Sequence, residues 1–163
     1  MRIFAHIIFV FRNLNRFIMF SCPIQIRMSD LDPYNHVNNG SQCNYFDMGR
    51  SRFFEHAFQT KIDWLTFKYV LVHVGLNFKM PIRFHDDLVC ESAILEVGNS
   101  SFKMIQRLVD QKTGLVKTEC QAVVVYFDRE ANKSERIPDM EREMLEKLRV
   151  ESTLERCHFN NPR

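Results

Sequence analysis

Five segments predict β-strands. In the first two, apolar and polar residues alternate, because the side chains of a strand point in turn to its two faces, and the other three are rich in apolar residues and bounded by polar turns. The segments are residues 24–28, 70–80, 88–97, 102–109 and 115–127. Short polar turns separate the last three, which predicts an antiparallel meander. Pro81 follows the second segment and predicts either its end or a place at a sheet edge.

One long helix is predicted between the first two strands. Tyr45, Gly49, Phe53 and Ala57 recur at helical spacing after two asparagines that are good N-cap residues. A glycine in a helix interior costs about 1 kcal/mol relative to alanine. Gly49 therefore predicts that this helix approaches a sheet closely.

These elements together predict an α+β fold. An antiparallel meander has one apolar face that needs cover, and the long helix is the only element large enough to cover it. A shorter helix is predicted from Pro138 to about Arg149. The expected architecture is a curved antiparallel sheet wrapped around one long central helix, with a C-terminal helix.

The length of 163 residues predicts one domain. We place it at residues 21–150, between an N-terminal extension (1–20) and a polar tail (151–163). The net charge of +2 comes without a cluster of Lys and Arg, which argues against a nucleic-acid partner. The five cysteines are scattered and none has the spacing of zinc ligands, so we expect no metal. We expect them to be reduced thiols in a cytoplasmic protein.

Residues 1–18 contain no acidic side chain and carry apolar residues at helical spacing. Arg12 and Arg16 argue against a membrane-spanning helix, which would need about 20 apolar residues. The pattern fits an organellar targeting segment or an amphipathic helix on a membrane surface. It also fits a start codon assigned too early, with Met19 as the first residue, and we favour that interpretation.

The densest candidate chemistry lies in residues 30–50, DLDPYNHVNNGSQCNYFDMGR. A carboxylate in the loop before a helix can act as a general base or a nucleophile, and the free amides of the helix N-terminus can stabilise an oxyanion. The alternative is that Asp30 and Asp32 only shape the turn. His36 is equally suited to be a base or a structural loop residue.

The stretch resembles the hotdog-fold acyl-CoA thioesterases of the 4-hydroxybenzoyl-CoA thioesterase type. The resemblance rests on four blocks that cover roughly residues 22–150 in the right order: Asp30 to Asn39 with Tyr45, Phe46, Asp47 and Arg50; Phe78, Pro81, Arg83, Asp87 and Leu88; residues 98–102; and residues 136–138. Asn35 stands where the family has glycine, and asparagine tolerates a left-handed backbone. Gln42 replaces a tyrosine early in the helix, which could alter the acyl pocket.

The resemblance implies hydrolysis of an acyl-CoA to a free acid and coenzyme A, with Asp32 as the catalytic residue and Asp30 structural. His36, Asn38 and Asn39 are then candidates to bind the substrate, and no cofactor is expected. Coenzyme A phosphates call for a nearby cation, for which Arg83 is a candidate along with three other basic residues, Lys79, Lys103 and Arg107. The family also implies a homodimer or homotetramer with the active site between subunits.

Two alternatives remain at this stage. The same fold could hydrolyse thioesters of acyl carrier protein, which would require a basic docking patch around the cleft. It could also be an acyl-binding module without catalytic activity.

Overall fold

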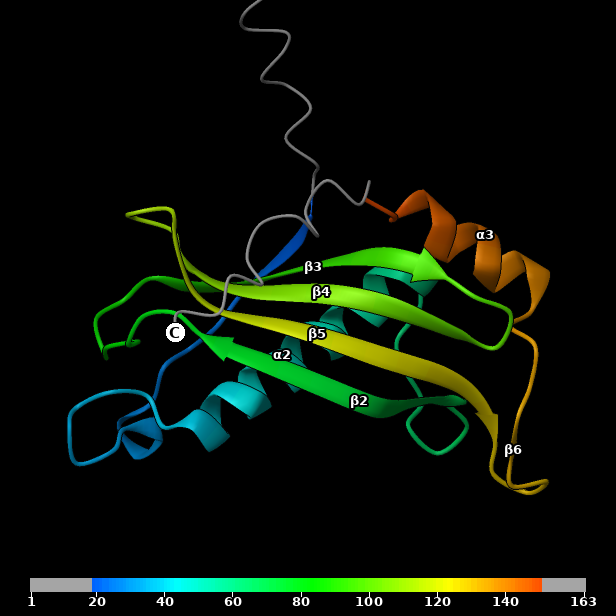
Figure 1. Cartoon of the computed structure of the whole chain (residues 1–163), viewed down its shortest axis with the longest axis horizontal. Helices are drawn as coiled ribbons and strands as arrows, with labels where there is room; N and C mark the ends of the chain where they lie inside the picture. Colours follow the sequence, from blue (N-terminus) through cyan, green and yellow to red (C-terminus); the bar gives the residue numbers. More distant parts are fainter. Residues whose placement is uncertain (1–18, 151–163) are drawn as a thin grey trace, which may run out of the picture.

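The computed structural model describes residues 19–150. Predictions for residues 1–18 and 151–163 lie outside this range. The described chain forms one antiparallel sheet and two α-helices, which confirms the predicted fold class (Figure 1). The strands are β1 (Phe20–Pro23), β2 (Tyr69–Phe78), β3 (Leu88–Val97), β4 (Ser101–Asp110), β5 (Leu115–Asp128) and β6 (Lys133–Ser134).

The strand order is β1-β3-β4-β5-β2, and β6 pairs with the end of β5. The meander predicted from the last three segments is therefore present as β3, β4 and β5. The predicted strand at residues 24–28 is wrong, because β1 lies earlier and ends at Pro23. Ile24 still donates its amide to the carbonyl of Leu88, and the chain then leaves the sheet through the short 3-10 helix η1 (Met28–Asp30).

Helix α2 (Asn39–Phe58) crosses one face of the sheet and is the predicted central helix. The side chain of Asn38 caps it by accepting the amide of Gly40 at 2.7 Å. Phe46 and Phe53 are each only 1% exposed and anchor the helix in the core. A Cβ atom at Gly49 would lie 2.3 Å from Sγ of Cys90 on β3, which confirms the predicted close approach.

The C-terminal helix α3 (Asp139–Lys147) packs against β3 and α2, and Leu145 is its buried contact. Its predicted range of 138–149 is close to the observed one. Within residues 19–150, no helix is long and apolar enough to cross a membrane.

Strand β2 forms one edge of the sheet and extends beyond the cover of α2, which packs mainly against β3, β1 and β4. Apolar side chains on β2 therefore stay exposed, with Leu71 37%, Val72 58%, Val74 41% and Phe78 44% accessible. The register against β5 shifts between Leu71 and His73. A long apolar edge strand of this kind is open to pairing with another chain.

Candidate active site

The loop between η1 and α2 holds the two aspartates of the motif in different ways. Asp30 accepts two hydrogen bonds on Oδ2, from the hydroxyl of Tyr45 at 2.6 Å and from the amide of Arg27 at 2.8 Å. Its backbone carbonyl accepts the amide of Asn38 at 2.8 Å. Asp30 therefore ties the loop to the helix, as a structural residue would.

Asp32 is held through one carboxylate oxygen only. Its Oδ1 accepts the amides of Tyr34 at 2.9 Å and of His36 at 3.1 Å. The backbone amide of Asp32 donates to the carbonyl of His36 at 2.8 Å, which closes the turn. Its Oδ2 accepts no hydrogen bond from the described residues. The side chain is thus fixed in direction and keeps one oxygen available.

Asn35 makes this turn possible, because its φ of 62° lies in the left-handed region. Asparagine is one of the few residues other than glycine that adopt this conformation at low cost. The replacement of the family's glycine by Asn35 therefore preserves the backbone path. Its amide donates to the carbonyl of Asp32 at 3.0 Å.

An open cavity of about 230 Å³ lies beside Asp32. It is lined by Asp32, His36, Val37, Asn39, Gln42, Phe78, Lys79, Met80 and Pro81. The structure therefore brings together three of the residues selected from the sequence: Asp32, His36 and Asn39. Asn38 does not line the cavity, since its side chain caps α2, and Arg83 lies outside the lining on an exposed turn.

The N-terminus of α2 opens onto the same cavity, because Asn39 is both its first residue and a lining residue. The side chain of Asn38 satisfies the amide of Gly40, and the carbonyl of Asn38 accepts the amide of Gln42. The amides of Asn39 and Ser41 donate to no acceptor among residues 19–150. Free amides at a helix N-terminus stabilise a nearby negative charge.

Gln42 links the loop to the sheet. Its Nε2 donates to the carbonyl of Val37 at 3.1 Å, and its Oε1 accepts the hydroxyl of Thr118 on β5 at 2.5 Å. Both Gln42 and Thr118 are buried. The sequence singled out Gln42 only as a departure from the family's tyrosine. Its partner is 76 residues away, and no local pattern indicates that contact.

The basic residues proposed for phosphate binding differ in their partners. Lys79 lies 3.4 Å and Arg107 3.2 Å from the same carboxylate oxygen of Glu119. Lys103 pairs with Glu96 at 2.8 Å, and this contact lowers the pKa of Glu96. Arg83 forms no ion pair with a carboxylate of the described residues. Of these four candidates, it is the one whose charge remains available at this end of the molecule.

No metal site accompanies this arrangement in the described part of the chain. Residues 19–150 contain no group of three or more His, Cys, Asp or Glu side chains placed to hold a metal ion. The four cysteines in this range, Cys22, Cys43, Cys90 and Cys120, form no disulfide. Burial raises the pKa of the Cys90 thiol and raises that of Cys120 to about 11, so neither is a reactive thiolate at neutral pH.

The site is suited to thioester hydrolysis. It combines a helix N-terminus, a loop carboxylate that is hydrogen-bonded through one oxygen only, and a cavity at the sheet edge. Residues 26–148 match the model of the thioesterase-like superfamily, and the chain belongs to this family. This confirms the family indicated by the four sequence blocks.

Individual relatives agree with the family assignment. The long-chain acyl-CoA thioesterase FadM of Escherichia coli (strain K12) is 24% identical over 128 residues, which are 77% of this chain and 96% of FadM. A thioesterase from Thermus thermophilus, solved in complex with coenzyme A and Zn, is 25% identical with a TM-score of 0.68. The match covers 78% of this chain and 92% of that one.

A structure from Bacillus stearothermophilus, described as that of a predicted thioesterase, has a TM-score of 0.75 at 23% identity. The match covers 82% of this chain and 98% of that one. At this identity the likeness concerns the fold. It shows that nearly the whole of a hotdog domain is present here.

Proposed function

We propose that this protein hydrolyses acyl-CoA thioesters to a free acid and coenzyme A, with Asp32 as the catalytic carboxylate. The observation that carries the proposal is the unequal use of the two Asp32 oxygens. Oδ1 is held by two loop amides, while Oδ2 accepts no hydrogen bond from residues 19–150. Asp32 and the first residue of α2, Asn39, line the same cavity. The relationship to FadM and to the coenzyme A complex from T. thermophilus supports the substrate class.

In the general-base route, Oδ2 of Asp32 takes a proton from a water molecule as the water oxygen attacks the thioester carbon. The carbonyl oxygen becomes an oxyanion. We assign its stabilisation to the amides of Asn39 and Ser41, which donate to no acceptor among residues 19–150. When the intermediate collapses, the carbon–sulfur bond breaks and the departing thiolate takes the proton from Asp32. The products are a carboxylic acid and the thiol of coenzyme A.

In the nucleophilic route, Oδ2 attacks the thioester carbon itself and expels the thiolate, which gives an acyl anhydride with Asp32. Water then hydrolyses the anhydride and regenerates the carboxylate. One turnover in ¹⁸O-labelled water tests for the anhydride. Label incorporated into Asp32 shows that the anhydride formed and was opened at the Asp32 carboxyl, whereas the general-base route leaves Asp32 unlabelled.

His36 is proposed as a structural and substrate-contacting residue. Its amide and carbonyl both bond to Asp32, so its backbone fixes the turn, and the residue lines the cavity. Asn39 also lines the cavity and contributes its free amide. The role of Asn38 is to cap α2 and so hold the free amides at the site.

Coenzyme A is favoured over acyl carrier protein as the carrier, because the rim of the site does not form a basic docking patch. Lys79 is paired with Glu119, and Lys117 lies 3.0 Å from Asp86. Of the basic residues considered for phosphate binding, Arg83 is exposed and forms no ion pair within residues 19–150. An available guanidinium fits one phosphate group better than the acidic helix of a carrier protein.

We further propose that the protein is a homodimer whose sheets join through β2. The exposed apolar residues of this edge support it, since pairing would bury Leu71, Val72, Val74 and Phe78. Two such dimers could form the homotetramer that the family also allows. The unpaired cysteines among residues 19–150 support the expected cytoplasmic location.

The function is tested by offering the purified protein a series of straight-chain acyl-CoAs, from acetyl to palmitoyl, while released thiol is measured. The proposal expects kcat/KM of about 10⁴ M⁻¹s⁻¹ or more for the preferred chain. The same acyl group on acyl carrier protein should react far more slowly. Binding of acyl-CoA without any thiol release would favour the non-catalytic acyl-binding module and refute the proposal.

A further inference from the structure

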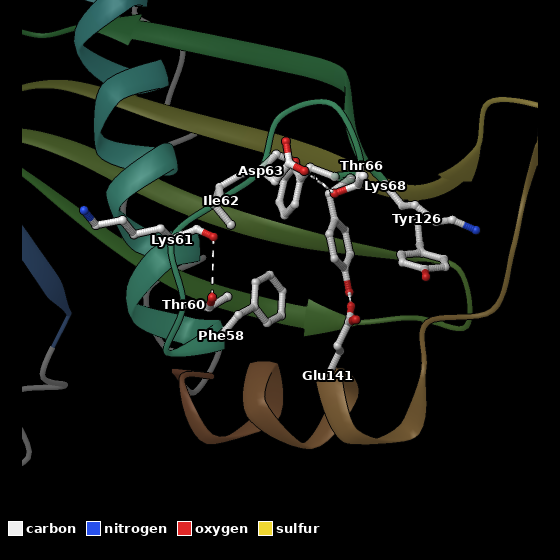
Figure 2. Close-up of a pocket in the computed structure, with 11 residues that line it drawn as sticks. Phe58, Thr60, Lys61, Ile62, Asp63, Thr66, Lys68, Tyr126 and Glu141 are labelled. Carbon is white, nitrogen blue, oxygen red and sulfur yellow. Dashed lines mark hydrogen bonds between the residues drawn. The ribbon is translucent and has the colours of Figure 1, made fainter.

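A second cavity lies at the opposite end of α2 from Asp32 and has a volume of about 350 Å³. Its apolar walls are Phe58, Ile62, Phe67, Tyr69 and Tyr126, and its polar rim is Thr60, Lys61, Asp63, Thr66, Lys68 and Glu141. Figure 2 shows these side chains between the end of α2, the loop that follows it and α3. Its size is in the range of ligand pockets, and its walls are aromatic.

Within one chain this cavity is out of reach of Asp32. Helix α2 has 20 residues, so its two ends are about 30 Å apart. The space between helix and sheet is filled by side chains that are at most 1% exposed, among them Phe46, Phe53, Phe102 and Met104. An acyl chain bound at Asp32 cannot pass beneath the helix of its own subunit.

The cavity beside Asp32 is instead open toward the free edge of β2. Phe78 and Met80 line it, and they remain 44% and 41% exposed. An apolar tail that leaves the thioester carbonyl would follow these two side chains outward. It would then reach the edge at which a second copy is proposed to pair.

Antiparallel pairing of two β2 edges places the beginning of one strand beside the end of the other. Tyr69 begins β2 and lines the second cavity, whereas Phe78 ends β2 and lines the cavity beside Asp32. The two-fold axis of such a pair is perpendicular to the sheet, so both α2 helices lie on the same face. Figure 1 shows the loop before α2 and the loop after it at opposite ends of β2.

We propose that the tail of the acyl chain bound at Asp32 of one subunit lies in the Phe58–Tyr69 cavity of the other subunit, whose lining sets the preferred chain length. This inference rests on the proposed function and on the proposed dimer. It identifies the substrate as a thioester with an extended apolar acyl chain. It also assigns the chain-length specificity to residues far from Asp32 in their own subunit.

The loop that bounds this cavity supports the assignment. Trp64 and Leu65 are 55% and 86% exposed, although both are large and apolar. Arg129 holds the loop by donating to the carbonyls of Leu65 at 3.5 Å and Phe67 at 3.2 Å. The loop is therefore anchored while its apolar side chains stay exposed, where the second subunit and its acyl chain would cover them.

The first test fills the cavity with Thr60→Trp. Thr60 is exposed and lines the cavity, so the larger side chain replaces no buried contact. The ratio of kcat/KM for palmitoyl-CoA to that for a short acyl-CoA should fall about tenfold or more, the loss expected when methylenes are denied burial. Glu143→Trp on the exposed face of α3 is the matched control and should leave this ratio unchanged. An equal loss for short and long chains would overturn the inference.

The second test uses mixed dimers made from two differently tagged chains. A dimer of an Asp32→Asn chain and a Thr60→Trp chain contains one intact Asp32, which lies in the Thr60→Trp chain and faces the intact cavity of the Asp32→Asn chain across the interface. It should keep about half of the wild-type palmitoyl-CoA activity. The second mixed dimer joins a wild-type chain to a chain with both Asp32→Asn and Thr60→Trp. Its intact Asp32 then faces the filled cavity, and its palmitoyl-CoA activity should be about a tenth of that of the first mixed dimer or less.

The reverse result, with activity lost in the first mixed dimer and kept in the second, would place the tail in the same subunit and overturn the inference. Equal activity of both mixed dimers would also overturn it. These outcomes require a wild-type enzyme that releases thiol. If the wild type releases none from any acyl-CoA, the proposed function itself fails, and the inference falls with it.

Discussion

The hydroxyl of Tyr45 donates to Oδ2 of Asp30 at 2.6 Å, and this bond separates the roles of the two loop aspartates. Asp30 is engaged by the helix, whereas Asp32 keeps a free oxygen at the cavity. Burial of Tyr45 and its bond to the carboxylate raise the pKa of its hydroxyl above the ordinary value of 10.0. The neutral hydroxyl is therefore stabilised in the folded protein.

Tyr45→Phe should lower the free energy of unfolding by about 2 kcal/mol, the value of a hydrogen bond to a charged group. The pKa is raised on folding, so this stabilisation is complete below pH 10 and is lost as the pH rises further. Urea unfolding at pH 7 and pH 11 should show a difference between the variant and wild type that shrinks at the higher pH. A difference that grows above pH 10 would contradict the assigned hydrogen bond.

Gln42→Met tests the link between loop and sheet. The substitution keeps the side-chain volume but leaves the carbonyl of Val37 and the hydroxyl of Thr118 without their buried partner. We expect a loss of about 2–3 kcal/mol in unfolding free energy, together with a lower kcat because the Asp32 loop is less well fixed. Thr118→Val is the matched partner for a double-mutant cycle. Additive effects of the two substitutions would show that the residues are not coupled.

Much of this fold follows from local pattern. Alternation identified β2 and helical spacing identified α2, because burial of one face imposes each period. The polar turns between apolar segments identified β3, β4 and β5. The Asn35 turn also follows from local chemistry, since few residues adopt a positive φ. The first strand was misplaced because Ile24 and Ile26 are apolar for another reason. Ile24, still bonded to Leu88 at the end of β1, and Ile26, beyond it, both pack against the core.

The candidate site was predictable only in part. Asp32, His36 and Asn39 lie within eight residues of one another, so a single loop brings them together. The bond between Gln42 and Thr118 and the wall formed by Phe78 and Met80 depend on the sheet's strand order. The cavity at the far end of α2 depends on the tertiary contacts of separate segments, and no spacing in the sequence indicates it.

Arg83→Ala tests the phosphate contact. The KM for acyl-CoA should rise about tenfold, as expected for loss of one charge-assisted hydrogen bond. The KM for the same acyl group on N-acetylcysteamine, which carries no phosphate, should not change. Arg136→Ala, at an arginine before α3, is the control and should alter neither value. An equal rise for both substrates would remove Arg83 from phosphate recognition.

Val74→Asp tests the proposed dimer, since Val74 is 41% exposed near the middle of β2. A charge repeated across the two-fold axis should oppose pairing of the strands. Light scattering should then report one chain where the wild type reports two, with an unchanged circular dichroism spectrum. Leu115→Asp, at an equally exposed apolar residue away from this edge, should leave the mass unchanged. A dimer that survives Val74→Asp would place the interface elsewhere.

The most direct test of the central claim is the turnover of Asp32→Asn on the acyl-CoA that the wild type prefers. Asparagine can still accept the amides of Tyr34 and His36 through its side-chain oxygen, so the loop and the unfolding free energy should be preserved. The account predicts that kcat falls by at least about 10²-fold, the range lost with a general base or nucleophile. A folded Asp32→Asn variant that releases coenzyme A at the wild-type rate would contradict it.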